Sequence, residues 1–266
     1  MNSFEKNSFK KRLVSMLKVD ARKTFVSTLY YIMLGVAFVM PILILVMTTM
    51  MDGTVNVNPQ TGVPTVIEGF DNVYQAIGIL SSAGMSMEMD LTGMCNINML
   101  YFLIAVPVCI FISDDFRSGY AKNLFTVRAK KSDYVISKTA MGFVVSLSMI
   151  LAFFVGTFIG GAVSNLPFTM QGFNAVNLIM CMFTKIFVSL IFVAIFVLAS
   201  VIAKQKLWLS MVLSFCFSML FYTMVPMITP LDASFINVIL TLVGGILIAV
   251  GLGLISNAVL KKTALV

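Results

Sequence analysis

Six long apolar segments constrain this chain more than any other feature of its sequence. Each holds at least 17 residues, and an α-helix needs about 20 apolar residues to cross roughly 30 Å of hydrocarbon. Strands of a membrane barrel would instead alternate over about ten residues. The sequence therefore predicts an all-α membrane protein with six transmembrane helices in one domain, with kinks at Pro41, Pro107 and Pro226. The expected spans within residues 1–266 are 25–50, 97–113, 134–158, 176–203, 207–228 and 235–260.

Composition excludes the other classes of protein. Hydrophobic residues make up 59% of the chain and charged residues only 11%, whereas a soluble domain has about 25% charged residues. A soluble fold leaves roughly a quarter of its unfolded surface wet and could not cover so much apolar area. A soluble enzyme, a disordered tail and a disulfide-rich secreted module are therefore ruled out. The four cysteines form no C-x-x-C pair, so neither a disulfide nor a zinc site is expected.

The basic residues have a one-sided distribution. With six spans, 17 of the 18 Lys and Arg residues lie in the leader, in or beside the loops after spans 2 and 4, and in the C-terminal tail. The loops on the other side contain none. By the positive-inside rule, both termini are expected in the cytoplasm. The net charge of +7 then reflects topology and attraction to anionic lipid, and no nucleic-acid partner is expected.

The leader, residues 1–24, has the pattern of an amphipathic helix. Phe9, Leu13, Met16 and Leu17 fall on one helical face, and basic residues surround it. This pattern predicts an interfacial helix that lies along the cytoplasmic leaflet. The alternative is a simple orientation signal made of basic residues.

The loop after span 2 has the features of a docking segment. Phe116, Tyr120, Leu124 and Phe125 recur at helical spacing, and charged residues flank them. A short helix parallel to the membrane with an aromatic face suits docking onto a soluble partner. The alternative is an amphipathic loop that faces lipid.

At these residues the chain resembles the type 2 ATP-binding-cassette exporter permeases. The resemblance covers the whole chain by topology and residues 113–138 by motif: an acidic pair, Phe-Arg-Ser-Gly, Lys-Asn, basic residues, then Tyr-Val-Ile-Ser-Lys. In that family the loop after span 2 forms a coupling helix that sits in a cleft of the ATPase. Members commonly have Glu at one acidic position, and Thr or Ser after the glycine. The resemblance implies that the following residues contact the ATPase or fix the coupling helix: Asp114, Asp115, Phe116, Arg117, Ser118, Gly119 and Tyr120.

The resemblance also implies partners. They are two copies of a cytoplasmic ATPase, a second permease that forms a homodimer or heterodimer, and the lipids of a bacterial plasma membrane. The chain has no G-x-x-x-x-G-K-[ST] phosphate loop and no histidine. It is therefore not expected to be an enzyme or to hold catalytic residues or a cofactor, and ATP and Mg would bind to the partner ATPase.

Small residues repeat every four positions in two of the expected spans. Gly156 and Gly160 lie at the end of span 3, and Gly245, Ala249 and Gly253 lie in span 6. Such stripes allow helix backbones to approach closely. They serve either packing within one subunit or a dimer seam, and the spacing alone does not distinguish these alternatives.

The cargo is expected to be hydrophobic or amphipathic, such as an antimicrobial peptide (bacteriocin), a lipid or a drug, moved outward. Phe217, Phe221, Tyr222 and Met224 of span 5 are the predicted cargo contacts, although they could equally face lipid. Lys185 is a cation inside span 4. It either extends to the outer interface or binds an anionic head group of the cargo.

The outer loop, residues 51–96, supports a competing interpretation. Met85, Met87 and Met89 place three thioethers on one face of an extended strand, and soft thioethers select Cu(I). A copper-handling membrane subunit is therefore one alternative function, and no other metal site is expected. A membrane sensor or scaffold that transports nothing is another.

Overall fold

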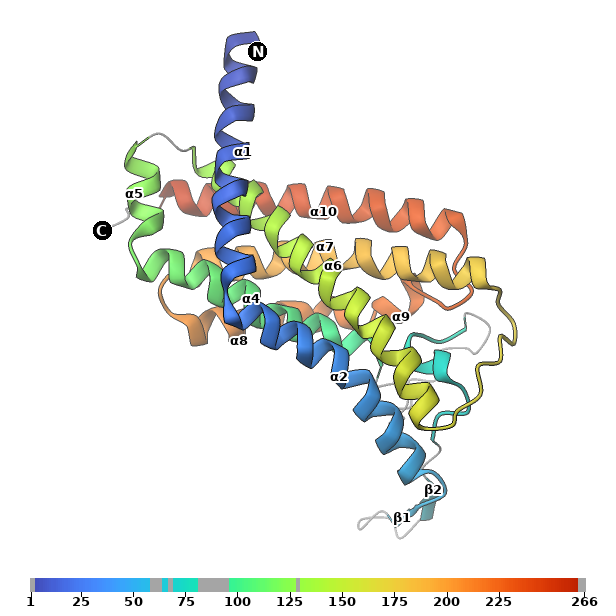
Figure 1. Cartoon of the computed structure of the whole chain (residues 1–266). Coiled ribbons are helices and arrows are strands. Elements are labelled where there is room, and N and C mark those ends of the chain that lie inside the picture. Colours follow the sequence, from blue (N-terminus) through green and yellow to red (C-terminus); the bar gives the residue numbers. More distant parts are fainter. Residues whose placement is uncertain (1–2, 58–63, 67–68, 81–95, 128–129, 263–266) are drawn as a thin grey trace.

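The computed structural model describes residues 3–57, 64–66, 69–80, 96–127 and 130–262. Helices dominate it, as the apolar segments predicted, and a two-stranded hairpin is the only sheet in the described residues (Figure 1). The elements are α1 (Ser3–Val26), α2 (Thr28–Met51), β1 (Val55–Val57), β2 (Pro64–Val66), η1 (Val73–Ala76), α4 (Asn98–Arg117), α5 (Tyr120–Val127), α6 (Lys131–Val163), α7 (Ala175–Ala203), α8 (Leu207–Tyr222), α9 (Val225–Ile228) and α10 (Phe235–Lys262).

Among the described residues, five helices are long and apolar enough to cross a membrane: α2, α4, α6, α7 and α10. The fifth expected span is interrupted. Helix α8 ends at Tyr222 after 16 residues, and α9 begins at Val225. Pro226 explains the break, because proline has no amide donor and is tolerated only in the first turn of a helix. Pro41 and Pro107, by contrast, lie inside continuous helices. The count of six spans therefore stays a prediction.

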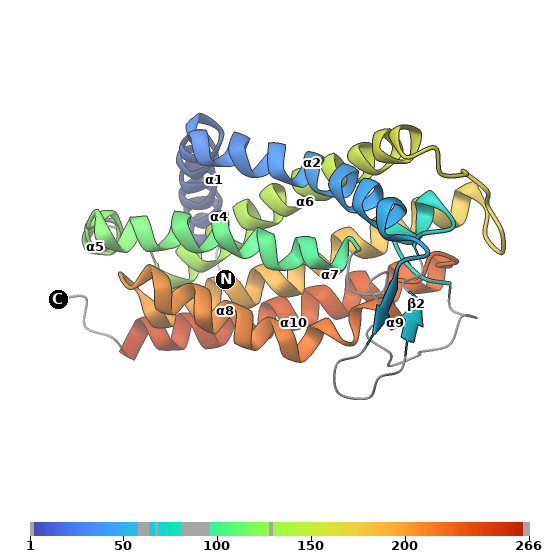
Figure 2. The same cartoon turned by 90° about the horizontal axis from the view of Figure 1, so that it is seen from below.

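Helix α7 forms the centre of the bundle. It packs against α4, α6, α8 and α10, and Figure 2 shows these helices around it. Every residue from Phe192 to Val201 is buried, so this part of the helix is covered on all sides. A helix that is apolar on all sides is covered on all sides, so α7 is the core helix.

Helix α1 is set apart from the bundle. It runs nearly perpendicular to α4, α7 and α10 (Figures 1 and 2), and Ser27 interrupts the helix between α1 and α2 with extended backbone angles. Met16 is buried and Phe9, Leu13 and Leu17 are half-buried, as the amphipathic pattern predicted. The structure adds that this face packs on α6 of the same chain.

The glycine stripe of α6 packs against α2. A Cβ atom on Gly156 would overlap the backbone carbonyl of Phe38, and one on Gly160 would lie 2.9 Å from the Cα of Ile42. In α10, a Cβ on Gly245 would lie 2.9 Å from the carbonyl oxygen of Phe187 on α7. These three glycines therefore serve packing within the subunit, which is the first of the two alternatives. Gly253 and Ala249 are half-buried, and a Cβ on Gly253 would make only an ordinary contact.

Helix α8 contacts the bundle through hydroxyl groups. Its buried residues are Ser210, Ser214 and Ser218. The Ser210 hydroxyl lies 2.6 Å from that of Ser200 on α7, and the Ser214 hydroxyl lies 3.2 Å from the Cys109 sulfur on α4. Most of the large apolar side chains of α8 are exposed, but Leu207 and Met211 pack against the core and Phe215 stacks on Phe102 of α4.

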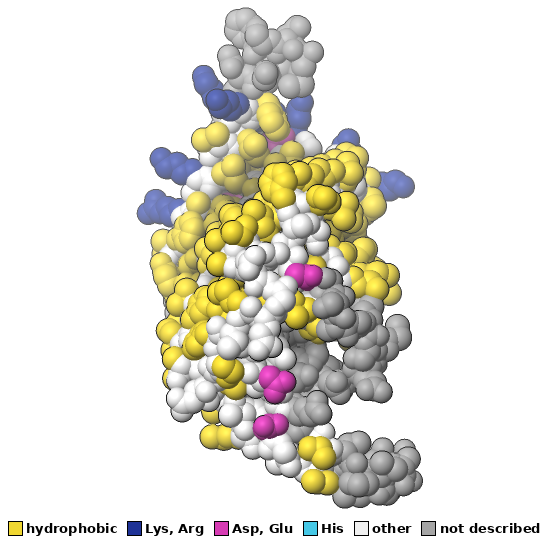
Figure 3. Space-filling view, turned by 90° about the vertical axis from the view of Figure 1, so that its right-hand side faces the viewer, with side chains coloured by type: hydrophobic (Ala, Val, Ile, Leu, Met, Phe, Trp, Pro, Cys, Tyr) yellow, Lys and Arg dark blue, Asp and Glu magenta, His cyan; other side chains and the backbone are white. Residues whose placement is uncertain are grey.

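The two ends of the bundle differ in charge. Helices α1 and α5 and the C-terminal end of α10 lie at one end, which we call the basic end (Figure 1). Figure 3 views the opposite end, where Asp and Glu side chains appear on the near surface. At that end η1 is buried against α2 and α6. This part of the segment between α2 and α4 therefore joins the protein core through a 3-10 turn of four residues.

Candidate functional site

The acidic pair of the loop motif belongs to a helix end. Helix α4 continues to Arg117, four residues beyond the expected end of span 2, so Asp114 and Asp115 lie in its last turn. Gly119 then adopts φ +73°, a left-handed conformation that favours glycine. The short helix after it is α5, of eight residues. The motif is thus a helix end, a glycine turn and the start of a new helix.

Asp115 is completely buried beneath this turn. Its carboxylate lies 2.5 Å from the ammonium of Lys138 on α6 and 2.6 Å from that of Lys23 on α1. The Tyr134 hydroxyl on α6 also donates to it at 3.2 Å. Asp115 therefore joins α1, α4 and α6, and it is not available to contact a soluble partner.

A second buried carboxylate completes this network. Asp20 on α1 pairs with Lys138 at 2.7 Å and accepts a hydrogen bond from Ser137 at 2.6 Å. Nearer the N-terminus, Arg12 pairs with Asp133 at 3.1 Å. We call Asp20, Lys23, Asp115 and Lys138 the junction network. Its two carboxylates and two ammonium groups balance in charge, which offsets part of the cost of removing them from water.

The motif contains two members of the junction network, Asp115 and Lys138, but only Asp115 is among the residues predicted to contact the ATPase or fix the coupling helix. Lys23 and Lys138 count in the sequence among the basic residues that set orientation, and no motif singles out Asp20. A signal was available for Asp20, since it is four residues from Met16 on the face predicted to be covered. A carboxylate on the covered face of a basic leader requires a buried cation as partner.

The other motif residues divide between the interior and the surface. Asp114, Arg117 and Ser118 are exposed. Phe116 is buried and packs edge-on against Tyr134. Tyr120 is half-buried. Burial raises the pKa of its phenol, and the negative charges of Asp20 and Asp115 raise it further, so the phenol stays protonated at neutral pH.

Helix α5 rests on this junction by one face. Phe125 packs edge-on against Tyr134 at 5.4 Å between ring centroids, and Ala121 is buried. Lys122, Asn123 and Thr126 are exposed on the other side. The arrangement gives a short helix at the basic end that is fixed to three other helices and has a polar outer face.

Comparison with known families explains this arrangement. A family model described as "ABC-2 family transporter protein" matches residues 16–221, which include α5 and the junction network. The chain belongs to the ABC-2 transporter family. No curated protein and no solved structure shows a significant match. The ABC-2 chain is therefore the membrane subunit of an ABC transporter, and its apolar helices make it a multi-pass membrane protein. Membership of this family implies an ABC ATPase as the partner.

Lys185 of this ABC-2 chain does not extend to an interface. Its side chain is completely buried, and its ammonium donates to Asn98 Oδ1 at 3.0 Å and to Thr229 Oγ1 at 2.8 Å. Among the described residues, no carboxylate pairs with it. The expected extension toward the outer interface is wrong, because α4 and the segment after α9 enclose the side chain. A role in binding cargo stays a prediction.

Removing an acceptor of Lys185 is expected to destabilise the protein. Asn98→Leu deletes a hydrogen bond to a buried cation and should lower the free energy of unfolding by about 2 kcal/mol. Thermal unfolding in detergent measures the change, with exposed Asn123→Leu as control. Adding Lys185→Met should recover part of the loss, because the unpaired ammonium is then absent. Additive losses in the double variant would contradict this interpretation.

The predicted cargo residues lie mostly on the outer surface of α8. Phe217, Phe221 and Met224 are exposed. Tyr222 packs against Phe102 of α4, with 4.9 Å between ring centroids. Their role in the cargo path stays a prediction. Met85, Met87 and Met89 lie outside the described residues, which contain no cluster of His, Cys, Asp and Glu able to hold a metal.

Proposed function

We propose that this ABC-2 subunit exports hydrophobic or amphipathic cargo, such as a peptide, a lipid or a drug. Two copies of a separate ATPase bind ATP and Mg and supply the energy, and a second permease completes the path. The observation that carries this proposal is α5, a short helix with an exposed polar face fixed to α1, α4 and α6. Such a helix is suited to receive a movement from a soluble partner and pass it to the membrane helices.

The charge distribution supports the orientation that this function requires. In the proposed orientation the basic end, with both termini, faces the cytoplasm of a bacterial cell. The described basic residues of α1 and of the segment around α5 belong to this end. The ATPase then meets α5 directly, and the opposite end of the bundle, which carries Asp and Glu side chains on its surface, faces outward.

The junction network supports a route for coupling. A movement of α5 reaches Tyr134 through Phe125, and Tyr134 donates to Asp115. Asp115 and Asp20 both hold Lys138, so α6 and α1 move with α4. Coupling therefore runs through charged contacts that apolar lipid cannot replace.

Charge reversal on the outer side of this junction tests the proposal. Arg117→Glu combined with Lys122→Glu should weaken co-purification of the ATPase about tenfold or more, since both side chains are exposed and like charges repel across an interface. ATP-dependent transport of a labelled amphipathic peptide in vesicles should fall with it. The control is Lys10→Glu with Lys11→Glu, which makes the same charge change on α1. A complex that stays intact in the first variant would contradict the docking role of α5.

A further inference from the structure

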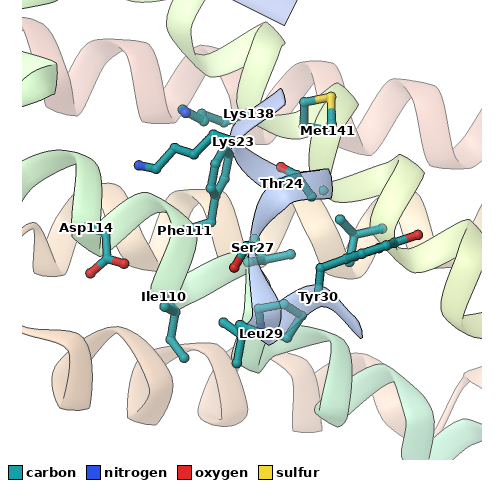
Figure 4. Close-up of a pocket in the computed structure, with 14 residues that line it drawn as sticks. Lys23, Thr24, Ser27, Leu29, Tyr30, Ile110, Phe111, Asp114, Lys138 and Met141 are labelled. Carbon is teal, nitrogen blue, oxygen red and sulfur yellow. The ribbon is translucent and has the colours of Figure 1, made fainter. Parts of the chain in front are cut away.

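A cleft lies beside the junction network, where α1 meets α2 against α4 and α6 (Figure 4). Its polar side is formed around Lys23, Thr24 and Ser27, at the interruption between α1 and α2. Its apolar side is formed by residues such as Leu29, Phe111 and Val145. One end of the cleft is thus polar and the rest is apolar. An amphiphilic ligand, with a polar head group and an apolar chain, has the same arrangement.

The polar side contains a hydroxyl that no described residue satisfies. Thr24 is only 7% exposed, and its Oγ1 has no hydrogen-bond partner among the described residues. In Figure 4 the oxygens of Thr24 and Ser27 both lie on the side that faces Phe111. A buried polar atom without a partner costs free energy, so such an atom at a cleft indicates a missing ligand group.

A helix N-terminus points to the same place. Helix α2, of 24 residues, begins at Thr28, and the side chain of its N-cap residue, Ser27, makes no capping hydrogen bond. The first amides of a helix have no partner within it, and they carry partial positive charge. The amide of Tyr30 already donates to the Ser27 carbonyl, so an anionic or acceptor group in the cleft would bind the first two amides together with the Thr24 and Ser27 hydroxyls.

Lys23 supplies the full positive charge. Its side chain is 42% exposed, and within the described part of the chain it pairs with the carboxylate of Asp115 alone. An ammonium group has three donors, so donors remain for a ligand. Lys138 is already held by Asp20 and Asp115 and lies over the Phe111 ring at 3.9 Å. The Asp114 carboxylate also lines the cleft, but it is exposed, so water screens its repulsion.

We propose that this cleft binds one anionic phospholipid, with its phosphate at Lys23, Thr24 and Ser27 and an acyl chain along Leu29, Phe111 and Val145. The position supports a lipid over a soluble anion, since the apolar wall would otherwise stay uncovered. The exposed basic residues of α1 attract anionic lipids to the same end of the molecule. The site does not involve the ATPase, so its test is independent of the proposed function.

Lipid binding to the purified full chain tests the proposal. Native mass spectrometry measures the dissociation constants of phosphatidylglycerol, phosphatidylcholine and glycerol 3-phosphate, which has the head group without the acyl chains. Phosphatidylglycerol should bind most tightly. Thr24→Val combined with Ser27→Ala should weaken it about fivefold, as expected for lost hydroxyl hydrogen bonds. The control is Thr28→Val, which alters an exposed threonine outside the cleft. This variant should bind phosphatidylglycerol as tightly as the unaltered chain does.

Folding does not obscure the result. The Thr24 hydroxyl has no partner to lose and the Ser27 side chain makes no capping hydrogen bond, so the double variant should have an unfolding midpoint no lower than that of the unaltered chain in the absence of lipid. Unchanged phosphatidylglycerol binding in that variant would overturn the proposal, as would equal binding of phosphatidylcholine. If glycerol 3-phosphate displaced phosphatidylglycerol at an equal concentration, the site would bind a free phosphate, and the proposal of a lipid site would also be overturned.

Discussion

Lys138→Met is expected to lower the free energy of unfolding by about 3–5 kcal/mol, because it leaves buried carboxylates without their cation. The Lys138 ammonium contacts both Asp20 and Asp115. Without it, the partners left within the described residues are Lys23 and Tyr134 for Asp115 and the Ser137 hydroxyl for Asp20. Chemical or thermal unfolding of the purified chain in detergent measures the loss.

Two further variants show whether the loss comes from the network. Lys122→Met removes an exposed lysine from α5 and should leave stability within about 0.5 kcal/mol. Adding Asp20→Asn to Lys138→Met should recover part of the loss, because one of the uncompensated charges is then absent. If Lys138→Met were as stable as the unaltered chain, the junction network would not hold α1 to α6.

Gly156→Ala is the second large effect, because it places a methyl group where α6 meets the backbone of α2. The added Cβ would overlap the Phe38 carbonyl and lie 2.8 Å from Cγ of Pro41. The helices must separate to accept it, and we expect a loss of about 2–3 kcal/mol in the free energy of unfolding. The same unfolding experiment measures it.

The matched control lies on the partner helix. Gly35→Ala adds the same methyl group to α2, where nothing lies within 4 Å of the new Cβ. It should raise stability by up to about 1 kcal/mol, because alanine is the better helix former. Equal effects of the two changes would mean that α2 and α6 do not pack through this glycine.

The spans were predictable because their signal is local. An apolar run of about 20 residues reports a membrane helix wherever its neighbours lie, and α7 and α10 begin within one residue of the expected positions. The break after Tyr222 was less predictable. Pro41 and Pro226 look alike in the sequence, yet the helix continues through the first and restarts at the second.

The candidate site was only partly predictable, because its contacts join distant segments. The motif identified Asp114 and Asp115 but left open which acid mattered. The rotation of α4 decides this, since it buries Asp115 and exposes Asp114. The pairing of Asp20 with Lys138 spans 118 positions in the sequence. Periodicity shows which face of a helix is covered, but it does not show which residue of another helix covers it.

The three buried serines through which α8 contacts the bundle have a geometric consequence for movement. Ser210, Ser214 and Ser218 repeat every four residues along one face, so a slide of α8 by four residues, about 6 Å, places each hydroxyl near the former position of the next. The rings of Phe215 and Tyr222, which pack on Phe102 of α4, oppose such a slide. The hydroxyls alone therefore do not fix the register of α8 against α7 and α4, and the aromatic contacts with α4 set it.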